Sequence, residues 1–433
     1  CILLDLCRIW NFSIMKVSTV SIDITPHNEV KLCGYINDVR NTQRTSVAHA
    51  PIYAIALYME IQDKKLLFIS MDVLSVTKER LRDLKERIQN QYDIDYDSIF
   101  VNAIHTHSGP SGFSVDAMGK EYENNEEFRN SVVDRIVSGL NHLFTNTQEA
   151  RSVIGKVNVK GFYDNRNDAN LYFDDEAYTL QFLNDQNQLV ASFVNLNVHS
   201  TVLGPFNMEI SYDLIGTIRE NLYKEYGTRP YVCIGTSADI SNRHFRQGDD
   251  FDELNRVSKG IADILIKNKQ YDEIILDRVD VKTFKYHLEY DNKVNYDYYR
   301  EELNRIQNEL DGTDDKTKVK LLTSSKDKYE SKLKIDIVSK DIECKVIDFP
   351  TLEIITFPGE LTSTFGKQLK SKSKKPYTII ITCCNDHHGY FIEKEQFGKC
   401  YESTATLIPK GQTEQIIEEL GNFIWCASSV QLI

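Results

Sequence analysis

Several features are scarce or missing in this 433-residue sequence. It has no run of eighteen apolar residues, which excludes a typical transmembrane helix. Its nine cysteines are scattered, odd in number and never spaced as CxxC, which argues against a disulfide framework or a zinc ribbon and favours reduced thiols. It also lacks the HExxH pattern of one class of metalloprotease, and no internal repeat or Pro/Gly/Ser-rich linker divides it.

Basic charge is also in short supply. Lysine and arginine number 51 against 64 acidic residues, so the formal net charge is −13. The one basic cluster, "KQLKSKSKKP" at 367–376, is interpreted as a solvated helix end and loop. We therefore expect no nucleic-acid partner and no more than transient contact with a membrane surface.

The two ends of the chain differ from what lies between them. A regular strand pattern begins at Met15, whereas residues 1–14 are too short and interrupted to span a bilayer and lack the features of a signal peptide. Residues 1–14 are interpreted as a non-native or disordered leader and 426–433 as a tail. The default expectation is a cytoplasmic protein.

Between these ends, strand-like and helix-like segments alternate. Segments 50–61 and 65–74 are apolar and predict a hairpin, and 77–92 has leucines at helical spacing. Further apolar strands are predicted to end close to histidines or small polar residues, as at 98–107 and 188–204. The pattern predicts one large α/β domain over 15–425, with a mixed β-sheet core flanked by helices.

Residues 287–335 have a different texture. They are highly charged, and their helical periodicity breaks at Asp311-Gly312, which predicts an exposed helical hairpin inserted into the domain. We expect this insertion to be mainly solvated; the alternative is that it covers a site or faces a partner.

The sequence "AIHTHSGPSG" at 103–112 is the first candidate site. In an extended strand, residues two apart point to the same side, so His105 and His107 are predicted to be neighbours at the end of a strand. Such a pair can bind a metal, or it can be hydrogen-bonded within a loop, and the motif alone does not separate the two. The Asp-His that follows HxH in metallo-β-lactamases is absent.

Three more segments have the same context, a strand followed at once by polar or small residues. They contain His199, Glu360 and the pair Asp239 and Ser241. Each has an ordinary structural explanation as well, such as a helix-terminal carboxylate or a serine turn. Because functional groups collect at strand ends along one edge of an α/β sheet, we expect the segments to meet.

These residues resemble one family over most of the chain, from about Met15 to about Ile424. The stretches that carry the resemblance are "SIDITP", "LCGY", "QRTSVAHAPIYAIAL", "KLLFISMDVL", "HTHSGPSGF", "NVHST", "FPGELT" and "GYFIEKEQFGKCYESTAT". Together, and in this order, they are similar to the neutral/alkaline (non-lysosomal) ceramidases, which are zinc amidases. The chain resembles their catalytic domain, without the additional C-terminal β-sandwich domain of secreted members.

The resemblance implies roles for eight residues. One Zn²⁺ per chain would be bound by His105, His199, Glu360 and Tyr390. The catalytic groups would be His107, Ser241, Arg166 and Tyr401. The serine motif departs from the family pattern, because Asn242-Arg243 follows Ser241 where the family has Pro-Asn.

The function that this implies is hydrolysis of the N-acyl bond of ceramide or a ceramide-like lipid to a fatty acid and a sphingoid base. A zinc ion on two imidazoles and a carboxylate would activate water and polarise the amide carbonyl. His107 could protonate the leaving amine, and Ser241, Arg166 or Tyr401 could stabilise the oxyanion; whether Ser241 acts as nucleophile stays open. The alternatives are a zinc hydrolase of another N-acyl or ester substrate, and an inactive homologue that binds a lipid or a partner.

Overall fold

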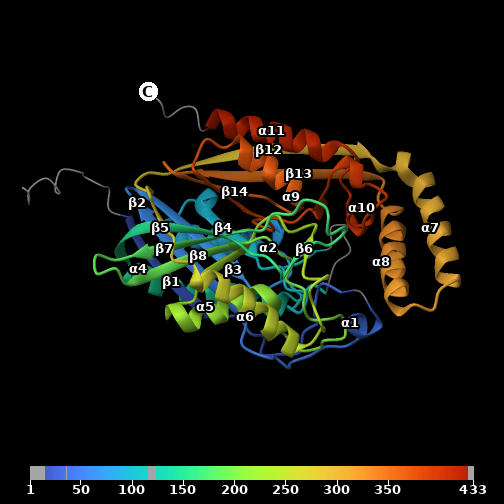
Figure 1. Cartoon of the computed structure of the whole chain (residues 1–433), viewed down its shortest axis with the longest axis horizontal. Helices are drawn as coiled ribbons and strands as arrows, with labels where there is room; N and C mark the ends of the chain where they lie inside the picture. The colour runs from blue at the N-terminus through green and yellow to red at the C-terminus, as the bar shows by residue number, and fades with distance from the viewer. Residues whose placement is uncertain (1–14, 36, 116–122, 428–433) are drawn as a thin grey trace, which may run out of the picture.

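The computed structural model describes residues 15–35, 37–115 and 123–427. The predicted leader at 1–14 and residues 428–433 of the predicted tail lie outside these ranges. Within them, strands and helices alternate as the sequence predicts, and both termini of the described chain lie at the same end of the molecule (Figure 1).

The larger of two extended sheets has nine strands among the described residues, in the order β4-β3-β2-β1-β5-β7-β8-β9, with β11 beside β5. Adjacent strands are antiparallel except for the pairs β3–β4 and β8–β9 at the two ends, so the sheet is mixed. Its strands are β1 (Met15–Asp23), β2 (Tyr53–Ile61), β3 (Lys64–Met71), β4 (Ile99–Ala103), β5 (Gln148–Asn158), β7 (Glu176–Leu183), β8 (Leu189–Leu196), β9 (Tyr231–Ile234) and β11 (Asp272–Ile274).

A second, four-stranded sheet packs on the first in the order β12-β13-β14-β16, with a parallel pair β14–β16. Its strands are β12 (Asp280–Asp291), β13 (Ile337–Asp348), β14 (Leu352–Thr356) and β16 (Tyr377–Ile381). Two short ladders complete the described strands, β6 (Asp164–Asn165) with β10 (Ile240–Ser241), and β15 (Glu360–Leu361) with β17 (Tyr390–Phe391). The α/β class is confirmed; the sequence pattern did not reveal that the core contains two packed sheets.

The α-helices cover the outer faces of this sheet pair or lie beside it. They are α1 (Asp38–Thr42), α2 (Lys78–Tyr92), α3 (Glu126–Gly139), α4 (Asn141–Thr145), α5 (Asp213–Tyr226), α6 (Phe251–Lys267), α7 (Tyr296–Asp311), α8 (Lys316–Lys332), α9 (Ser363–Lys372), α10 (Tyr401–Ala405) and α11 (Gln412–Ala427). No helix in the described ranges has both the length and the apolar composition needed to cross a lipid bilayer.

The layers follow from alternating side chains on strands that are buried on both faces. In β14, Ile354 faces the large sheet, and Ile355 faces the opposite core with α9 and α11. The other face of the large sheet packs against α2, α3, α5 and α6. Helices, two sheets and helices therefore form four layers, with α11 on one outer side and α5 and α6 on the other (Figure 1).

One chain segment connects the two sheets. The end strands β4 and β9 of the large sheet approach each other, since the Tyr231 hydroxyl donates to Asn102 Oδ1. The residues after β16 lie beside both: the Thr382 amide donates to the Ile234 carbonyl, and Cys383 accepts from the Ala103 amide. The carboxyl ends of β4, β9 and β16 consequently open into one region, where the candidate site lies.

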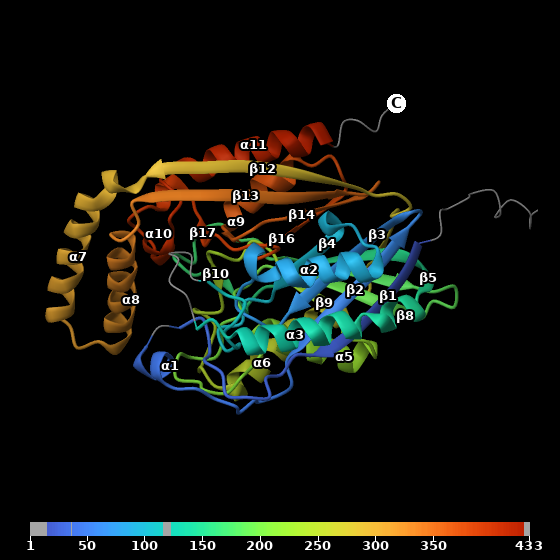
Figure 2. The same ribbon diagram turned by 180° about the vertical axis from the view of Figure 1, so that it is seen from behind.

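The charged insertion is a helical hairpin, as predicted, although its first residues belong to β12. Helices α7 and α8 project from one end of the molecule, and α8 is the inner one, beside α10 (Figures 1 and 2). The expectation that this segment is mainly solvated is wrong for α8. Leu321, Ser324 and Lys328, on one face of that helix, line the pocket described below.

Candidate active site

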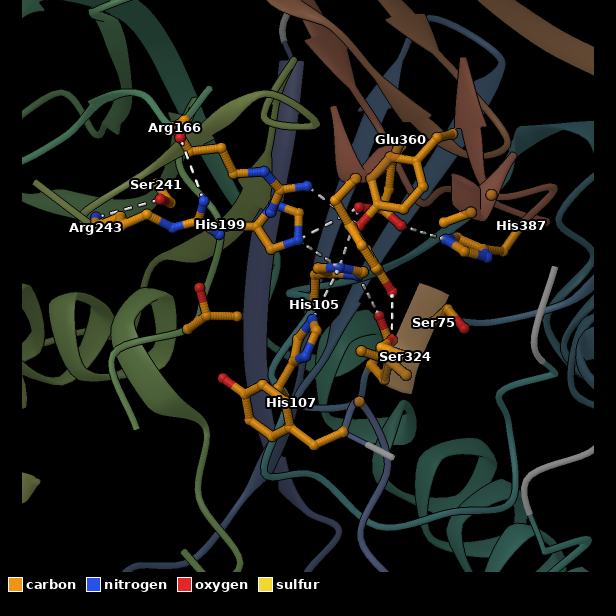
Figure 3. Close-up of a pocket in the computed structure, with 18 of the residues that line it drawn as sticks. Ser75, His105, His107, Arg166, His199, Ser241, Arg243, Ser324, Glu360 and His387 are labelled. Carbon is orange, nitrogen blue, oxygen red and sulfur yellow. Dashed lines mark hydrogen bonds and ion pairs between the residues drawn. The ribbon is translucent and has the colours of Figure 1, made fainter. Parts of the chain in front are cut away.

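A pocket of about 230 Å³ lies where the strand ends meet. All eight predicted site residues line it, although they are scattered over most of the sequence. They are His105, His107, Arg166, His199, Ser241, Glu360, Tyr390 and Tyr401. The sequence therefore indicated residues that share this pocket, and Figure 3 shows the arrangement of His105, His107, Arg166, His199, Ser241 and Glu360.

His105 and His107, in the motif at 103–112, are placed differently from the prediction. Strand β4 ends at Ala103, and His105 has a left-handed backbone with φ of 60°, so the pair does not extend a strand. The imidazoles nevertheless converge, with their Nε2 atoms 3.3 Å apart. Gly34 makes room for this arrangement, because a Cβ on it would lie 2.6 Å from Cγ of His107. The predicted proximity is confirmed, and the strand geometry used to predict it is wrong.

Four donor groups meet at the base of the pocket (Figure 3). Nε2 of His105 lies 3.2 Å from Nε2 of His199, and both atoms lie 3.4 Å from Oε2 of Glu360. The ring nitrogens of His105, His107 and His199 all lie within 4.8 Å of one another. His105, His199 and Glu360 are almost completely buried and His107 is partly buried, which shields their charges from water.

Backbone carbonyls orient two of these imidazoles. Nδ1 of His105 lies 2.9 Å from the carbonyl of Leu74, and Nδ1 of His199 lies 3.0 Å from that of Ser237. Donation from Nδ1 to a carbonyl leaves the Nε2 lone pair free for a metal, the usual arrangement around ligating histidines. Nδ1 of His107 is buried with no hydrogen-bond partner among the described residues, so this imidazole is less constrained.

The protonation states suit metal binding. Burial lowers the pKa of both His107 and His199 well below the usual range, so these rings are neutral at pH 7. Burial alone would raise the pKa of Glu360, but the adjacent His105 and His387 outweigh it and hold the pKa well below its usual range. Neutral imidazoles and a carboxylate are the forms in which these groups coordinate a cation.

This donor set passes a simple test for a zinc-sized ion. Ligands about 2.05 Å from a tetrahedral zinc are separated from one another by roughly 3.3–3.4 Å. The three distances that join Nε2 of His105, Nε2 of His199 and Oε2 of Glu360 are 3.2, 3.4 and 3.4 Å. In addition, Oε2 of Glu360 is buried with no hydrogen bond from the described residues. These three donors fit three positions around a tetrahedral metal ion.

A second possible group, His105 with Cys383 and His387, is less suitable. Sγ of Cys383 lies 3.8 Å from Nδ1 of His105, the atom already directed at the Leu74 carbonyl. Burial also raises the pKa of the Cys383 thiol well above its usual range, whereas a metal requires the thiolate. We therefore place the candidate metal centre at the Nε2 atoms of His105 and His199 and at Glu360, with His107 beside it.

Glu360 and Tyr390 are brought together by the backbone. They face each other in the parallel ladder between β15 and β17, and the Glu360 amide donates to the carbonyl of Gly389. The Tyr390 hydroxyl accepts from Nη2 of Arg166 at 3.4 Å. Burial raises the pKa of this hydroxyl well above the usual range, and the charge of Glu360 raises it further.

Arg166 is fixed in the wall of the pocket by Glu402. Its Nε donates to Oε1 of Glu402 at 2.5 Å, and Glu402 is fully buried. Burial alone would lower the pKa of Arg166, but the carboxylate outweighs it and the pKa is raised. The guanidinium therefore stays charged beside Tyr390.

The two remaining predicted groups lie on different sides of the pocket. The Ser241 hydroxyl accepts from the amide of Arg243 at 3.2 Å, the serine turn considered as its structural explanation. No imidazole lies within hydrogen-bond distance of that hydroxyl in the described chain. The Tyr401 hydroxyl lies 3.3 Å from that of Ser324 on α8, so Tyr401 connects the site to the insertion.

Sequence reasoning missed several residues of the site. His387 lies 3.3 Å from the second oxygen of Glu360, and Glu402 holds Arg166. Arg243 and Arg246 also line the pocket. His387 and Glu402 adjoin predicted residues, in "HHGY" and "CYES", so their spacing was the available signal. The contribution of α8 had no sequence signal.

Comparisons with known proteins agree with the motifs. Residues 16–226 match the sequence model of the N-terminal part of the neutral/alkaline non-lysosomal ceramidases. The fold is similar to that of the neutral ceramidase from Pseudomonas aeruginosa, with a TM-score of 0.73 and 16% identity, covering 96% of this chain and 75% of that one. A structure of a ceramidase complexed with C2 matches with a TM-score of 0.71 and 15% identity over the same shares.

The sequence match and the fold match overlap in the half of the chain that contains His105, His107, Arg166 and His199. The resemblance drawn from the short motifs is therefore confirmed. Residues 16–226 match the sequence model of the neutral/alkaline non-lysosomal ceramidase family, and the chain has the fold of a neutral ceramidase.

Proposed function

We propose that this protein is a zinc-dependent amidase that hydrolyses the N-acyl bond of ceramide or a ceramide-like N-acyl lipid, giving a fatty acid and a sphingoid base. The observation that carries the proposal is the buried meeting of three imidazole Nε2 atoms with Glu360, at the base of a pocket lined by all eight predicted residues. The family match supports the reaction class.

The metal supplies one part of the chemistry: when bound, zinc acts as a Lewis acid that activates water and polarises the amide carbonyl. His105, His199 and Glu360 would hold it, with Tyr390 beside them. The carbonyls of Leu74 and Ser237 fix the two ring orientations, so the lone pairs are aligned before an ion arrives.

His107 is the best candidate for moving a proton. Its imidazole adjoins the donor set, it is neutral, and no described residue accepts a hydrogen bond from its Nδ1. A neutral ring can take a proton as water attacks and deliver it to the leaving amine nitrogen, which must be protonated before the C–N bond breaks.

Arg166 and Tyr401 are placed to stabilise the negative charge that develops on the carbonyl oxygen. Arg166 is charged, buried and held by Glu402, so its orientation costs nothing at the moment of reaction. Ser241 has no adjacent base, which favours a role as a hydrogen-bonding group rather than a nucleophile. Leu74, Val115, Leu321 and Ala405 provide apolar surface for the acyl chain.

The proposal is tested by measuring metal content and hydrolysis on the same preparations. Natively purified protein should contain about one zinc per chain, should release fatty acid from a short-chain fluorescent ceramide, and should lose both properties in His105→Ala. His142→Ala is the matched control, because that histidine lies in α4 away from the pocket. Wild-type protein without any transition metal would contradict the mechanism, and activity only on other N-acyl or ester compounds would contradict the lipid substrate.

A further inference from the structure

Two adjacent histidines, His387 and His388, have different surroundings. His387 lines the site pocket with a side chain that is 9% exposed, and its Nε2 lies 3.3 Å from Oε1 of Glu360 (Figure 3). His388 is not among the residues that line the pocket, and its Nε2 lies 3.1 Å from the carbonyl of Asp341 on β13. One histidine of the pair thus contacts the candidate metal centre, and the other contacts the small sheet.

The two oxygens of Glu360 have different neighbours. Oε2 lies 3.4 Å from Nε2 of both His105 and His199, at the candidate metal position. Oε1 faces His387, and Figure 3 shows His387 and His199 on opposite sides of the carboxylate. Carboxylates that bind metals are usually oriented by a hydrogen-bond donor that is not itself a ligand. His387 occupies the place of that donor.

The backbone fixes His387 relative to Glu360. The amide that follows His387 donates to the carbonyl of Pro358. The Glu360 amide donates in turn to the carbonyl of Gly389. Gly359 permits this close approach, because a Cβ on it would lie 2.7 Å from the Gly389 carbonyl oxygen. The position of the imidazole beside the carboxylate is therefore set by the main chain on both sides.

A purely structural role leaves this imidazole unexplained. Its Nδ1 is buried without a hydrogen-bond partner in the described chain, and the approach of Nε2 to Glu360 is the ring's one polar contact there. Leaving both nitrogens unsatisfied would cost roughly 1–3 kcal/mol for each. Because a carboxylate only accepts hydrogen bonds, a hydrogen on Nε2 satisfies the ring and Oε1 together.

We infer, resting on the proposed zinc amidase function, that His387 is a positioning residue that donates from Nε2 to Oε1 of Glu360, so that Oε2 alone faces the metal. A carboxylate that turned both oxygens to the ion would take up the position that a catalytic zinc keeps open for water. His387 prevents that rotation and keeps the position available.

The test measures the zinc affinity of metal-free protein by competition with a chelator, which needs no turnover. His387→Asn and His387→Phe place no donor at Oε1, so the zinc dissociation constant should rise about 10- to 100-fold. His387→Gln puts an amide N–H close to the position of Nε2 and should recover most of the affinity. His388→Phe is the matched control and should bind zinc like the wild type, because that ring contacts Asp341 instead.

Cobalt(II) in place of zinc gives a readout that a merely structural role would not move. In His387→Asn, the visible absorption bands should weaken as the metal gains a second oxygen of Glu360 as a ligand. His387→Gln and His388→Phe should keep the wild-type spectrum. With saturating zinc, kcat for a short-chain ceramide should fall about 10-fold in His387→Asn, while KM stays unchanged.

Several outcomes would overturn the inference. Wild-type zinc affinity and an unchanged cobalt spectrum in folded His387→Asn would do so. Equal losses in His387→Asn and His387→Gln would show that the imidazole acts as more than a hydrogen-bond donor. Equal losses in His387→Phe and His388→Phe would point to a disturbed loop. The asparagine and glutamine variants remain a usable pair if the phenylalanine variants do not fold.

The zinc measurement also separates this inference from the proposed function. A wild type that binds zinc but hydrolyses no ceramide would contradict the proposed function, and the affinity series would still test His387. A wild type that binds no transition metal would overturn both.

Discussion

Two buried arginine–carboxylate pairs occur in this molecule, and they differ in what they leave unsatisfied. Arg219 on α5 donates to both oxygens of Asp72 at 2.6 and 2.9 Å, and its Nε donates to Glu220. The rings of Tyr53 and Tyr212 lie against its guanidinium. Each of its three guanidinium nitrogens donates to a carboxylate, and it does not line the site pocket.

Arg166 has the same kind of partner in a different setting. Glu402 takes its Nε, and its Nη2 also reaches the hydroxyl of Tyr390 on the pocket wall. The carboxylate fixes the guanidinium without surrounding it. Burial and pairing with a carboxylate therefore do not by themselves distinguish a structural arginine from a functional one. The two are distinguished by where the guanidinium N–H groups point, into the protein core or toward the pocket.

The largest change is expected in stability, on breaking the pair formed by Arg219 and Asp72. Arg219→Met leaves Asp72 buried without its cation, which should lower the free energy of unfolding by about 3–5 kcal/mol. Urea denaturation measures this. Removing the orphaned charge as well, in Arg219→Met with Asp72→Leu, should recover part of the loss; no recovery would mean that packing, rather than charge, dominates this pair.

The second largest effect is expected for the pair formed by Arg166 and Glu402 in the pocket wall. Arg166→Lys keeps a positive charge beside Glu402 but loses the planar fork, so kcat/KM for amide hydrolysis should fall about 100- to 1000-fold, the effect of losing one oxyanion donor. Its stability should change less than that of Arg219→Met. Arg219→Lys is the control, with normal kcat/KM for the folded protein. Equal loss of activity in both lysine variants would remove the distinction between the two pairs.

A smaller effect is expected from replacing Glu402, the carboxylate that holds Arg166. Glu402→Gln preserves shape but leaves Arg166 less firmly held, and kcat/KM should drop about 10-fold, as for other groups that orient a functional side chain. Glu402→Asp retains the charge and should lie between the variant and the wild type. Wild-type activity in Glu402→Gln would show that Tyr390 and the backbone suffice to position Arg166.

Asp239 differs from both pairs, because it is a buried carboxylate that forms no ion pair with a cation among the described residues. It accepts hydrogen bonds from Ser363 and Asn165, and burial raises its pKa to about 7. Because the folded-state pKa exceeds the unfolded one, the stabilisation is complete below about pH 4 and is lost as the pH rises through about 7.

This pH effect is a change in stability rather than in activity. Between pH 5 and pH 8, the Tm of the wild type should fall relative to that of Asp239→Asn by about 2–4 °C. Thermal scans of both proteins across this range measure it. A difference in Tm that does not vary with pH, or that changes in favour of the wild type, would show that the hydrogen bonds outweigh burial.

The sequence predicted the site better than it predicted its geometry. Short motifs found His105, His199 and Glu360 because each follows a buried strand, and the pocket gathers all of them. The reason offered for the histidine pair was wrong, since strand periodicity cannot reveal that His105 adopts a positive φ. A local backbone conformation of that kind is set by tertiary contacts, which the periodicity of a sequence does not contain.

The fold was predicted by class but not by arrangement. Alternating strands and helices indicated an α/β domain, yet strands buried on both faces, such as β14 and β16, read as plain apolar runs whichever sheet they join. The position of α8 was also hidden. Its charged residues look solvated in the sequence, and only the folded chain shows that one face of the helix closes the pocket.

The junction after β16 has a consequence for how the protein acquires its site. His105 follows strand β4 of the large sheet, and Glu360 follows strand β14 of the small one. The two donors therefore stay apart until the sheets have packed and the Cys383 carbonyl has accepted its hydrogen bond from the Ala103 amide. Contacts so distant along the chain form slowly. We therefore expect the donor set to assemble late in folding, and uptake of a divalent ion by refolding protein would then report the packing of the two sheets.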